Sequence, residues 1–151
     1  MIFIKKLFYL FLPIICGSII GLLTSNSIDY GVLNQPPLSP PGYIFPIVWS
    51  ILYLLMGISY YLFKNKYYKD AKLESIVYYA QLAVNLLWSI FFFVLNWRLF
   101  SIGWTILLLL LVIYLIFLFY DKNKISAYLN IPYLLWLIFA TYLTIGVYIL
   151  N

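Results

Sequence analysis

The 151-residue chain contains no histidine and a single cysteine, Cys16. These absences exclude a zinc site built from cysteine and histidine, a disulfide within the chain and a Ser-His-Asp triad. Because every acidic residue lies outside the apolar runs, a proton relay through membrane carboxylates is not expected either. We therefore assign no catalytic residue, no metal site and no required cofactor. The acidic residues are Asp29, Asp70, Glu74 and Asp121.

Charged residues are scarce and apolar residues abundant. Hydrophobic residues make up 66% of the chain, aromatic residues 22% and charged residues 9%, which is more apolar surface than one soluble core of this size could bury. The net charge of +5 is spread over short segments between apolar runs, so a nucleic-acid partner is not expected. The composition predicts that a lipid bilayer surrounds the chain.

Five apolar runs are long enough to cross a membrane as helices. A bilayer core of about 30 Å needs roughly 20 helical residues, and the runs occupy residues 7–24, 43–63, 75–97, 100–120 and 127–150. Helices satisfy their own backbone hydrogen bonds in lipid, and a run such as TILLLLLVIYLIFLF lacks the alternation of a membrane β-barrel. We predict an all-α integral membrane protein, a single domain over residues 1–151 folded as a five-transmembrane-helix bundle.

The basic residues divide unequally between the two sides of this topology. The N-terminus and the second and fourth connections carry eight lysines, whereas the opposite side carries Arg98 alone. The positive-inside rule then predicts a cytoplasmic N-terminus, with the C-terminus and the proline-rich loop of residues 25–42 outside. We expect the membrane to be a bacterial inner membrane.

The first run has a second interpretation. Lys5 and Lys6 before LFYLFLPIICGSIIGLL also resemble a signal peptide with a cleavage zone from Thr24 to Ser27, although no A-x-A-like site is present. Cleavage there would leave four helices and the same outer loop. The prediction of a binding site is therefore the same under both interpretations.

Five of the seven prolines lie in the stretch PPLSPPGYIFPIVW. Consecutive prolines hold φ near −65° and keep the preceding residues out of the helical region, so an ordered extended arm ending at Gly42 is expected. Pro46 then falls in the first turn of the second helix, where its missing N–H costs nothing. The arm is either a stiff loop leading into that helix or a lid over the mouth of the bundle, formed by Pro36, Pro37, Pro40, Pro41 and Gly42.

Polar and aromatic residues recur at helical spacing inside three spans. In the third span, Gln81 and Asn85 share a face with Trp88 and Phe92, and amides at this depth should look into the bundle or a cavity because lipid offers them no partner. Tyr78 and Asn96 extend the same face. Similar faces of the second and fifth spans consist of Phe45, Trp49, Leu52, Met56 and Tyr60, and of Pro132, Trp136, Phe139 and Leu143.

The tryptophans differ in their expected depth. Trp97 and Trp104 flank the turn at Arg98 and are predicted to lie at the membrane interface. Trp88 and Trp136 lie roughly 10 residues into their spans, or about 15 Å deep, where no headgroup reaches. That depth fits plain helix packing or the wall of a cavity.

Three separated motifs resemble the TspO/translocator protein family, the tryptophan-rich sensory proteins also called peripheral-type benzodiazepine receptors. They are PPLSPPGYIFPIVWSILYLLMG, QLAVNLLWSIFFF and IPYLLWLIFATYL. The resemblance implies a five-helix bundle whose cavity opens toward the first long loop and binds tetrapyrroles such as protoporphyrin IX. It also favours cavity walls over plain packing for the deep tryptophans.

The resemblance singles out Trp49, Asn85 and Trp136 as ligand contacts, and it matches Tyr30 only by position in the loop. A flat apolar macrocycle gains most from aromatic faces and a few orienting polar groups. The absence of histidine argues against a haem held by an axial histidine, so a metal-free porphyrin, or haem bound by its face, fits better. The predicted ligand-binding set is Trp49, Asn85, Trp136, Trp88, Gln81, Phe45, Phe92, Phe139 and Tyr30.

Some positions depart from the family pattern. Leu38 stands where many members carry a loop tryptophan, and Thr144 and Tyr148 replace an asparagine and a tryptophan of the fifth span. No basic residue follows Tyr148, so the weak cholesterol consensus is missing and sterol binding is not expected. Gly17 and Gly21 form a G-x-x-x-G motif that fits bundle packing as well as it fits the homodimer expected from the family.

The function predicted is that of a membrane receptor or binding protein that senses, sequesters or transports porphyrin-like ligands. One alternative is the light-driven oxidation of a bound porphyrin, and another is a small transporter with alternating access. The sequence offers no positioned acid, base or nucleophile, so the chain is not expected to be an enzyme. Inverted repeats with broken helices, typical of many secondary transporters, are not visible.

Overall fold

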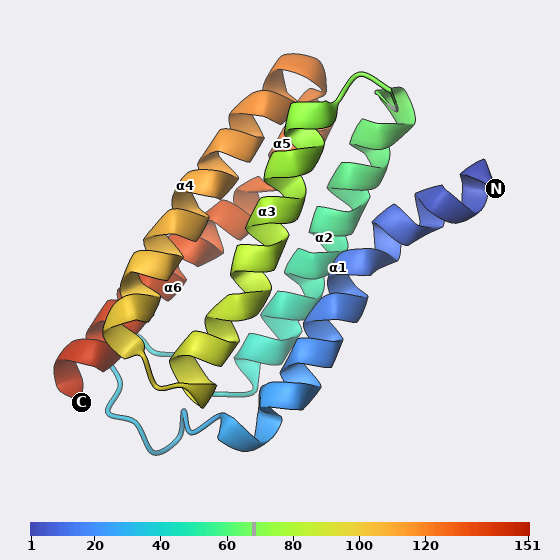
Figure 1. The fold of residues 1–151 in the computed structure, drawn as a ribbon. Helices are drawn as coiled ribbons and strands as arrows, with labels where there is room; N and C mark the ends of the chain where they lie inside the picture. The colour runs from blue at the N-terminus through green and yellow to red at the C-terminus, as the bar shows by residue number, and fades with distance from the viewer. Residues whose placement is uncertain (68) are drawn as a thin grey trace.

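The computed structural model describes residues 1–67 and 69–151, and within these residues the chain is helical and contains no strand. Five stretches of the described chain are long and apolar enough to cross a membrane, which confirms the predicted all-α fold class. The elements, seen in Figure 1, are α1 (Ile2–Thr24), η1 (Ser25–Ser27), α2 (Ile44–Lys66), α3 (Lys72–Ser89), η2 (Ile90–Val94), α4 (Arg98–Lys122), α5 (Lys124–Tyr128) and α6 (Ile131–Leu150).

The helices pack side by side around the bundle, and one neighbouring pair makes few contacts. α1 packs along α2, α3 packs along α4, and α4 also packs against α5 and α6. α1 also meets α3. α2 meets α5 and touches α6 over only a few residues, so the boundary between α2 and α6 has few close backbone contacts. We call this boundary the α2–α6 seam.

The densest packing lies in the half of the bundle that carries the lysines. Tyr60 stacks on Tyr78 with ring centroids 3.9 Å apart, and Phe63 stacks on Phe119 at 4.2 Å. All four rings are almost completely buried. α4 supplies a stripe with alternating spacings of four and three residues, as expected for a helix with one buried face: Ser101, Thr105, Leu108, Val112, Leu115 and Phe119.

The third span ends earlier and less regularly than the sequence suggests. After Ser89 the helix widens into the π turn η2, where the Leu95 N–H donates to the Ile90 carbonyl at 2.9 Å. Asn96 then adopts a positive φ of 55° and lies exposed outside the helix. The predicted extension of the Gln81 face to Asn96 is therefore wrong, because the extra residue in the π turn breaks the helical spacing.

The fifth predicted helix is divided in two. α5 ends at Tyr128 and α6 begins at Ile131 with Pro132 in its first turn. A proline at this point has no N–H to continue the preceding helix but fits the start of a new one. Pro132 is exposed and Tyr133 beside it is buried, so the prediction that Pro132 lies on the inner face was wrong by one residue.

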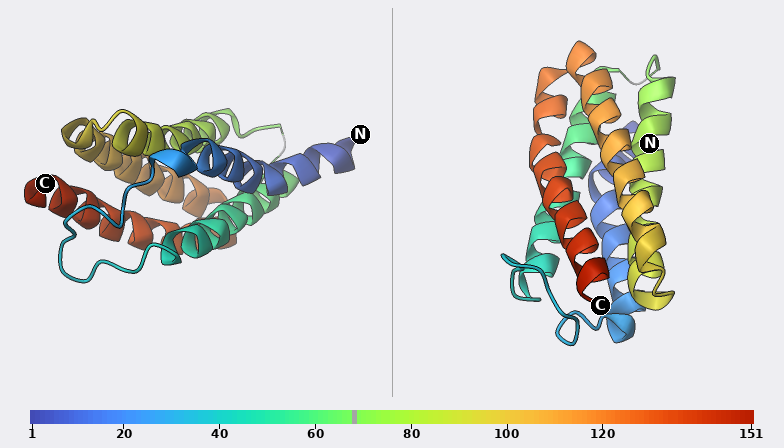
Figure 2. Two further views of the ribbon diagram at one scale, coloured as in Figure 1. Left: turned by 90° about the horizontal axis from the view of Figure 1, so that it is seen from below. Right: turned by 90° about the vertical axis from the view of Figure 1, so that its left-hand side faces the viewer.

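The proline-rich loop reaches the C-terminal end of α6 before it returns to α2 (Figure 2). It is not the extended arm expected from its prolines. Ser39 donates both its N–H and its hydroxyl to the Pro36 carbonyl, at 3.3 and 2.7 Å, which closes a turn around Pro37 and Leu38. Leu38 has a positive φ of 68°, a conformation that glycine or asparagine adopts more easily at this position of a turn.

α1 is the least buried of the spans and is bent. Pro13 lies within the helix and is buried, and its missing N–H and its ring disrupt the preceding turn. In Figure 1 the half of α1 before this point projects from the bundle at its N-terminal end. In the other half, Gly17 lets the Tyr53 ring of α2 approach closely, whereas Gly21 faces open space. Packing inside the bundle thus uses the first glycine of the G-x-x-x-G motif.

Candidate functional site

Four of the predicted site residues form a continuous chain of aromatic contacts at the α2–α6 seam. Tyr30 of the loop meets Phe45 of α2 with ring centroids 4.8 Å apart, and Phe45 meets Trp136 of α6 at 5.9 Å. Trp136 in turn contacts Phe139 at 5.5 Å. These contacts join the loop, the first turn of α2 and the middle of α6. We call Tyr30, Phe45, Trp136 and Phe139 the seam cluster.

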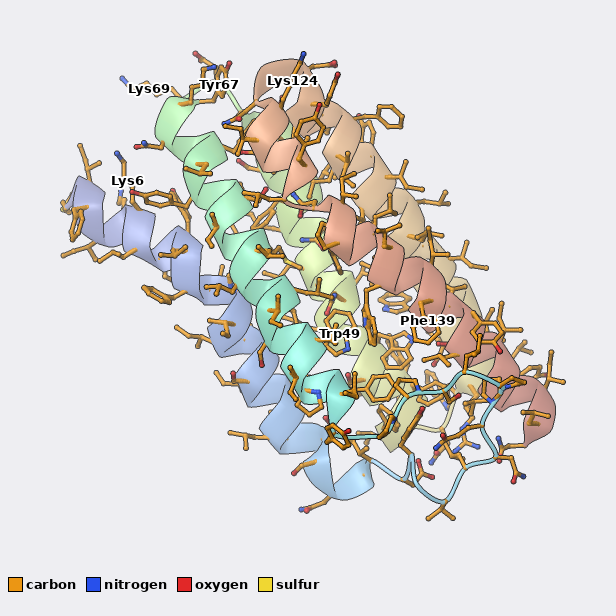
Figure 3. The ribbon with its side chains drawn as sticks, turned by 180° about the vertical axis from the view of Figure 1, so that it is seen from behind. Lys6, Trp49, Tyr67, Lys69, Lys124 and Phe139 are labelled. Atoms are coloured by element: carbon orange, nitrogen blue, oxygen red, sulfur yellow. The ribbon has the colours of Figure 1, made fainter. Side chains whose placement is uncertain are left out.

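Trp49 lies next to this cluster, one helical turn after Phe45. Its ring is 5.5 Å from that of Tyr53 and 6.2 Å from that of Tyr133. Figure 3 shows Trp49 of α2 and Phe139 of α6 on the two sides of the seam, at the loop end of the bundle. Trp49 therefore connects the seam cluster with the polar interior beneath it.

The buried amides form a hydrogen-bonded network of their own. The Tyr53 hydroxyl donates to Asn85 Oδ1 at 2.7 Å, and Asn85 Nδ2 donates to the Tyr133 hydroxyl at 2.6 Å. The Tyr133 hydroxyl donates onward to Gln81 Oε1 at 2.9 Å, and Gln81 Nε2 contacts the Met56 sulfur at 3.3 Å. Both polar atoms of the Asn85 side chain are thus satisfied within the protein, which lowers the cost of placing an amide at membrane depth.

Tyr53 and Tyr133 belong to this site although the sequence pattern did not single them out. Tyr53 lies one turn after Trp49, so its spacing was a usable signal. Tyr133 follows Pro132 in the IPYLLW motif and is 1% exposed. The two hydroxyls became recognisable only once α2, α3 and α6 were placed together, because their partner is Asn85 on a third helix.

The predicted residues at the end of α3 form a second aromatic group. Trp88 stacks on Phe92 with centroids 4.8 Å apart, and the Arg98 guanidinium lies 5.9 Å from the Phe92 ring. The ring contacts among the described residues do not join this pair to the seam cluster. The structure therefore divides the predicted set into the seam cluster with Trp49, the Gln81 and Asn85 network, and the pair of Trp88 with Phe92.

Hydrogen bonds and a close packing contact hold the proline-rich loop against α6, at the loop end of the seam. Pro36 is buried and packs against Gly146, where a side chain would collide with the proline ring. The Tyr142 hydroxyl donates to the Pro37 carbonyl at 2.6 Å. Asn34 and Asn151 exchange hydrogen bonds at 3.0 and 2.8 Å. The loop thus lies over the end of α6, in the position of a closed lid.

The other half of the loop is fastened to itself and to α2. The Tyr30 hydroxyl donates to the Pro40 carbonyl at 3.0 Å, and burial raises the pKa of this phenol above its usual value. The phenol therefore stays protonated and able to donate at physiological pH. The carbonyl groups of Pro41 and Gly42 accept from the first N–H groups of α2, at 3.0 and 3.4 Å.

The cavity expected beneath the lid is not open in this structure. Two open surface hollows in the described chain lie elsewhere: one of about 540 Å³ beside the turn between α3 and α4, lined by Asn96 to Phe100 with Tyr148 and Asn151, and one of about 420 Å³ on α1. At the seam, the rings of Phe45 and Trp136 contact each other instead. The cavity therefore stays a prediction, and in this structure the aromatic side chains that would line it contact each other.

Two of the buried tryptophans at this end of the bundle have indole N–H groups without a hydrogen-bond partner. The indole N–H groups of Trp88 and Trp136 are shielded from solvent and meet no hydrogen-bond acceptor among the described residues. A buried donor without a partner costs roughly 1–3 kcal/mol. By contrast, the Trp104 indole donates to the Val84 carbonyl at 2.7 Å. Both indole N–H groups are hydrogen-bond donors without a partner, so a ligand that carries hydrogen-bond acceptors would complement them.

The described residues hold no cluster of three or more histidine, cysteine, aspartate or glutamate side chains suited to a metal ion. The one ion pair at the loop end joins Arg98 to Asp29 at 3.5 Å, and the other described pair joins Lys122 to Glu74 at 2.6 Å in the opposite half. The chemistry available at the seam is therefore that of aromatic surfaces and hydrogen-bond donors.

The fold and this site define a class of protein: a polytopic helical membrane protein with a chain of aromatic contacts between α2 and α6 and a proline-rich loop held against the end of α6. The model of the TspO/MBR family matches residues 9–150, and the chain belongs to this family. The tryptophan-rich protein TspO of Archaeoglobus fulgidus is 34% identical over 134 residues, which cover 87% of this chain and 86% of the relative.

Two other relatives widen the comparison. Protein CrtK of Rhodobacter capsulatus is 32% identical over 143 residues, covering 93% of this chain and 89% of the relative. The translocator protein of Bos taurus is 33% identical over 118 residues, covering 74% of this chain and 68% of the relative. The relatives thus include proteins named for sensing and for translocation, among them a tryptophan-rich sensory protein of Cereibacter sphaeroides.

Proposed function

We propose that this membrane protein is a receptor for tetrapyrroles of the protoporphyrin type, which it binds at the α2–α6 seam beneath the proline-rich lid. The observation that carries the proposal is the seam cluster, in which rings from the loop, α2 and α6 touch at a boundary with few close backbone contacts. A flat macrocycle inserted between these rings would exchange their edge contacts for larger stacked contacts.

The polar groups support a ligand with acceptors at its edge. The Trp136 indole N–H has no acceptor in the closed state, and the carboxylates of a protoporphyrin could supply one. Asn85, in contrast, already uses both ends of its amide. We therefore assign Trp49, Trp136, Phe45, Phe139 and Tyr30 to ligand contact and Gln81 and Asn85 to support of the site.

Binding as proposed requires the lid to move, because the seam is closed by its own rings. Sensing, sequestration and transport are all compatible with such a closed state, and the relatives include a tryptophan-rich sensory protein and a translocator protein. We propose a binding protein rather than an enzyme. We also propose that the lysine-rich end is cytoplasmic in a bacterial inner membrane, which places the lid outside.

Titration of the detergent-solubilised protein with protoporphyrin IX, followed by quenching of tryptophan fluorescence, tests this assignment. Trp136→Ala removes the ring that joins α2 to α6, and we expect the dissociation constant to rise about tenfold or more, the loss of one aromatic contact in a pocket. Trp97→Ala is the matched control, because Trp97 is exposed and lies outside the seam. Equal affinities of the two variants would refute binding at the seam.

A further inference from the structure

A second hollow lies on α1, far from the lid. It has a volume of about 420 Å³ and is lined by Ile4, Lys5, Phe8 and Tyr9. The N-terminal end of α1 projects from the bundle (Figure 1), while Lys6 and Tyr9 on its inner side contact α2. Ile4 and Phe8 are consequently exposed, at 70% and 57% of their surfaces. The hollow therefore combines apolar walls with one lysine at a helix end.

Lys5 differs from most of the lysines around it. Lys6 donates to Asn65 Oδ1 at 2.5 Å, and Lys122 pairs with Glu74. Lys124 lies over the Tyr120 ring at 5.3 Å. Within the described part of the chain, the Lys5 ammonium group has no ion pair, hydrogen bond or ring contact, and only its backbone N–H donates, to the Met1 carbonyl at 3.3 Å. Its ammonium group is available to a molecule from outside the protein.

The position of the hollow determines what can fill it. α1 is long and apolar enough to cross a membrane, and Lys5 stands in its first turns, where the acyl region meets the headgroups. The surrounding end of the bundle carries eight lysines and three acidic residues, whereas the lid end carries only Arg98 and Asp29. A lysine beside an apolar surface at this depth matches an anionic headgroup joined to an acyl chain.

We propose that this hollow is a binding site for a single anionic phospholipid of the leaflet at the lysine-rich end. Lys5 contacts the phosphate, and an acyl chain lies along Ile4 and Phe8. Tyr9 forms the inner wall, because its ring packs against Tyr60 of α2 at 5.2 Å. The inference is independent of tetrapyrrole binding, because the hollow and the lid lie at opposite ends of α1.

Native mass spectrometry can measure this binding directly. The protein is mixed with equimolar dioleoyl-phosphatidylglycerol and dioleoyl-phosphatidylcholine, and the retained lipid is identified for each variant. We expect one phosphatidylglycerol to be retained in preference to phosphatidylcholine. Lys5→Gln should weaken its retention about fivefold, the effect of one lysine near an anionic surface. Phe8→Ala should weaken retention of the lipid without changing the charge.

Lys124→Gln is the matched control, because Lys124 lies at the same end of the bundle and engages the Tyr120 ring instead of the hollow. Its retention of phosphatidylglycerol should equal that of the unaltered protein. Equal losses in the Lys5 and Lys124 variants would overturn the site in favour of a diffuse positive field. Retention of phosphatidylcholine as strong as that of phosphatidylglycerol would overturn the headgroup assignment. Displacement of the lipid by equimolar glycerol phosphate would overturn the acyl contact.

Discussion

The two halves of the bundle use aromatic side chains in different ways. In the lysine-bearing half, Phe63 stacks on Phe119 with an angle of 11° between the rings, and both residues are 0% exposed. At the α2–α6 seam, Phe45 meets Trp136 edge to face at 70°, and both residues remain partly exposed. The first pair fills a core between α2 and α4. The second pair closes a boundary between helices that barely touch.

The stacked pair of Phe63 and Phe119 stabilises the fold, whereas the rings of Phe45 and Trp136 can contact a ligand. The stacked Phe63 and Phe119 rings carry no polar group that a ligand could satisfy, and their separation would open a void. The Trp136 ring keeps a buried N–H without an acceptor, and its neighbours are loop and helix-end residues. The seam is therefore the part of the bundle that can open at the lowest cost.

The largest expected effect is on stability and lies in the lysine-bearing half. Phe63→Ala should lower the free energy of unfolding by about 3–5 kcal/mol, because the void beside Phe119 cannot collapse easily. Phe45→Ala at the seam should cost only about 1 kcal/mol, since its ring is partly exposed. Denaturant unfolding in detergent micelles compares the two variants. Similar losses for both would remove the distinction between core and seam.

A smaller effect is expected for the polar network between these regions. Tyr133→Phe removes the hydroxyl that Asn85 and Gln81 share, and should cost about 1–2 kcal/mol of unfolding free energy. Tyr78→Phe is the matched control: Tyr78 is equally buried, but its hydroxyl has no partner among the described residues. The same unfolding assay should find the control unchanged or slightly stabilised. A cost as large for Tyr78 as for Tyr133 would contradict the role of the network.

Much of the fold, but less of the site, could be predicted from the sequence. The long apolar runs identify the spans, and the spacing of Gln81 and Asn85 correctly places both on a buried face. The break before α6 and the π turn η2 were missed, because each depends on one or two residues inside an otherwise apolar run. Tyr133 was missed because its function depends on Asn85, which lies on another helix.

The closed seam is a further feature that residue patterns do not reveal. The same faces of α2 and α6 that would line a cavity can also pack against each other, and helical spacing is identical in the two cases. The spacing identified Phe45 and Trp136 as neighbours of one site, and the three-dimensional arrangement adds that their rings touch. The loop is held against α6 through residues that no periodic pattern marks, such as Tyr142 and Gly146.

Locking the lid tests the central claim most directly. Asn34 of the loop and Asn151 at the end of α6 exchange two hydrogen bonds, so Asn34→Cys with Asn151→Cys, in a chain whose Cys16 is replaced by serine, should form a disulfide that holds the loop on α6. Our account predicts that the oxidised protein loses protoporphyrin binding and that reduction restores it. Equal affinity of the oxidised and reduced protein would contradict binding at the seam beneath the lid.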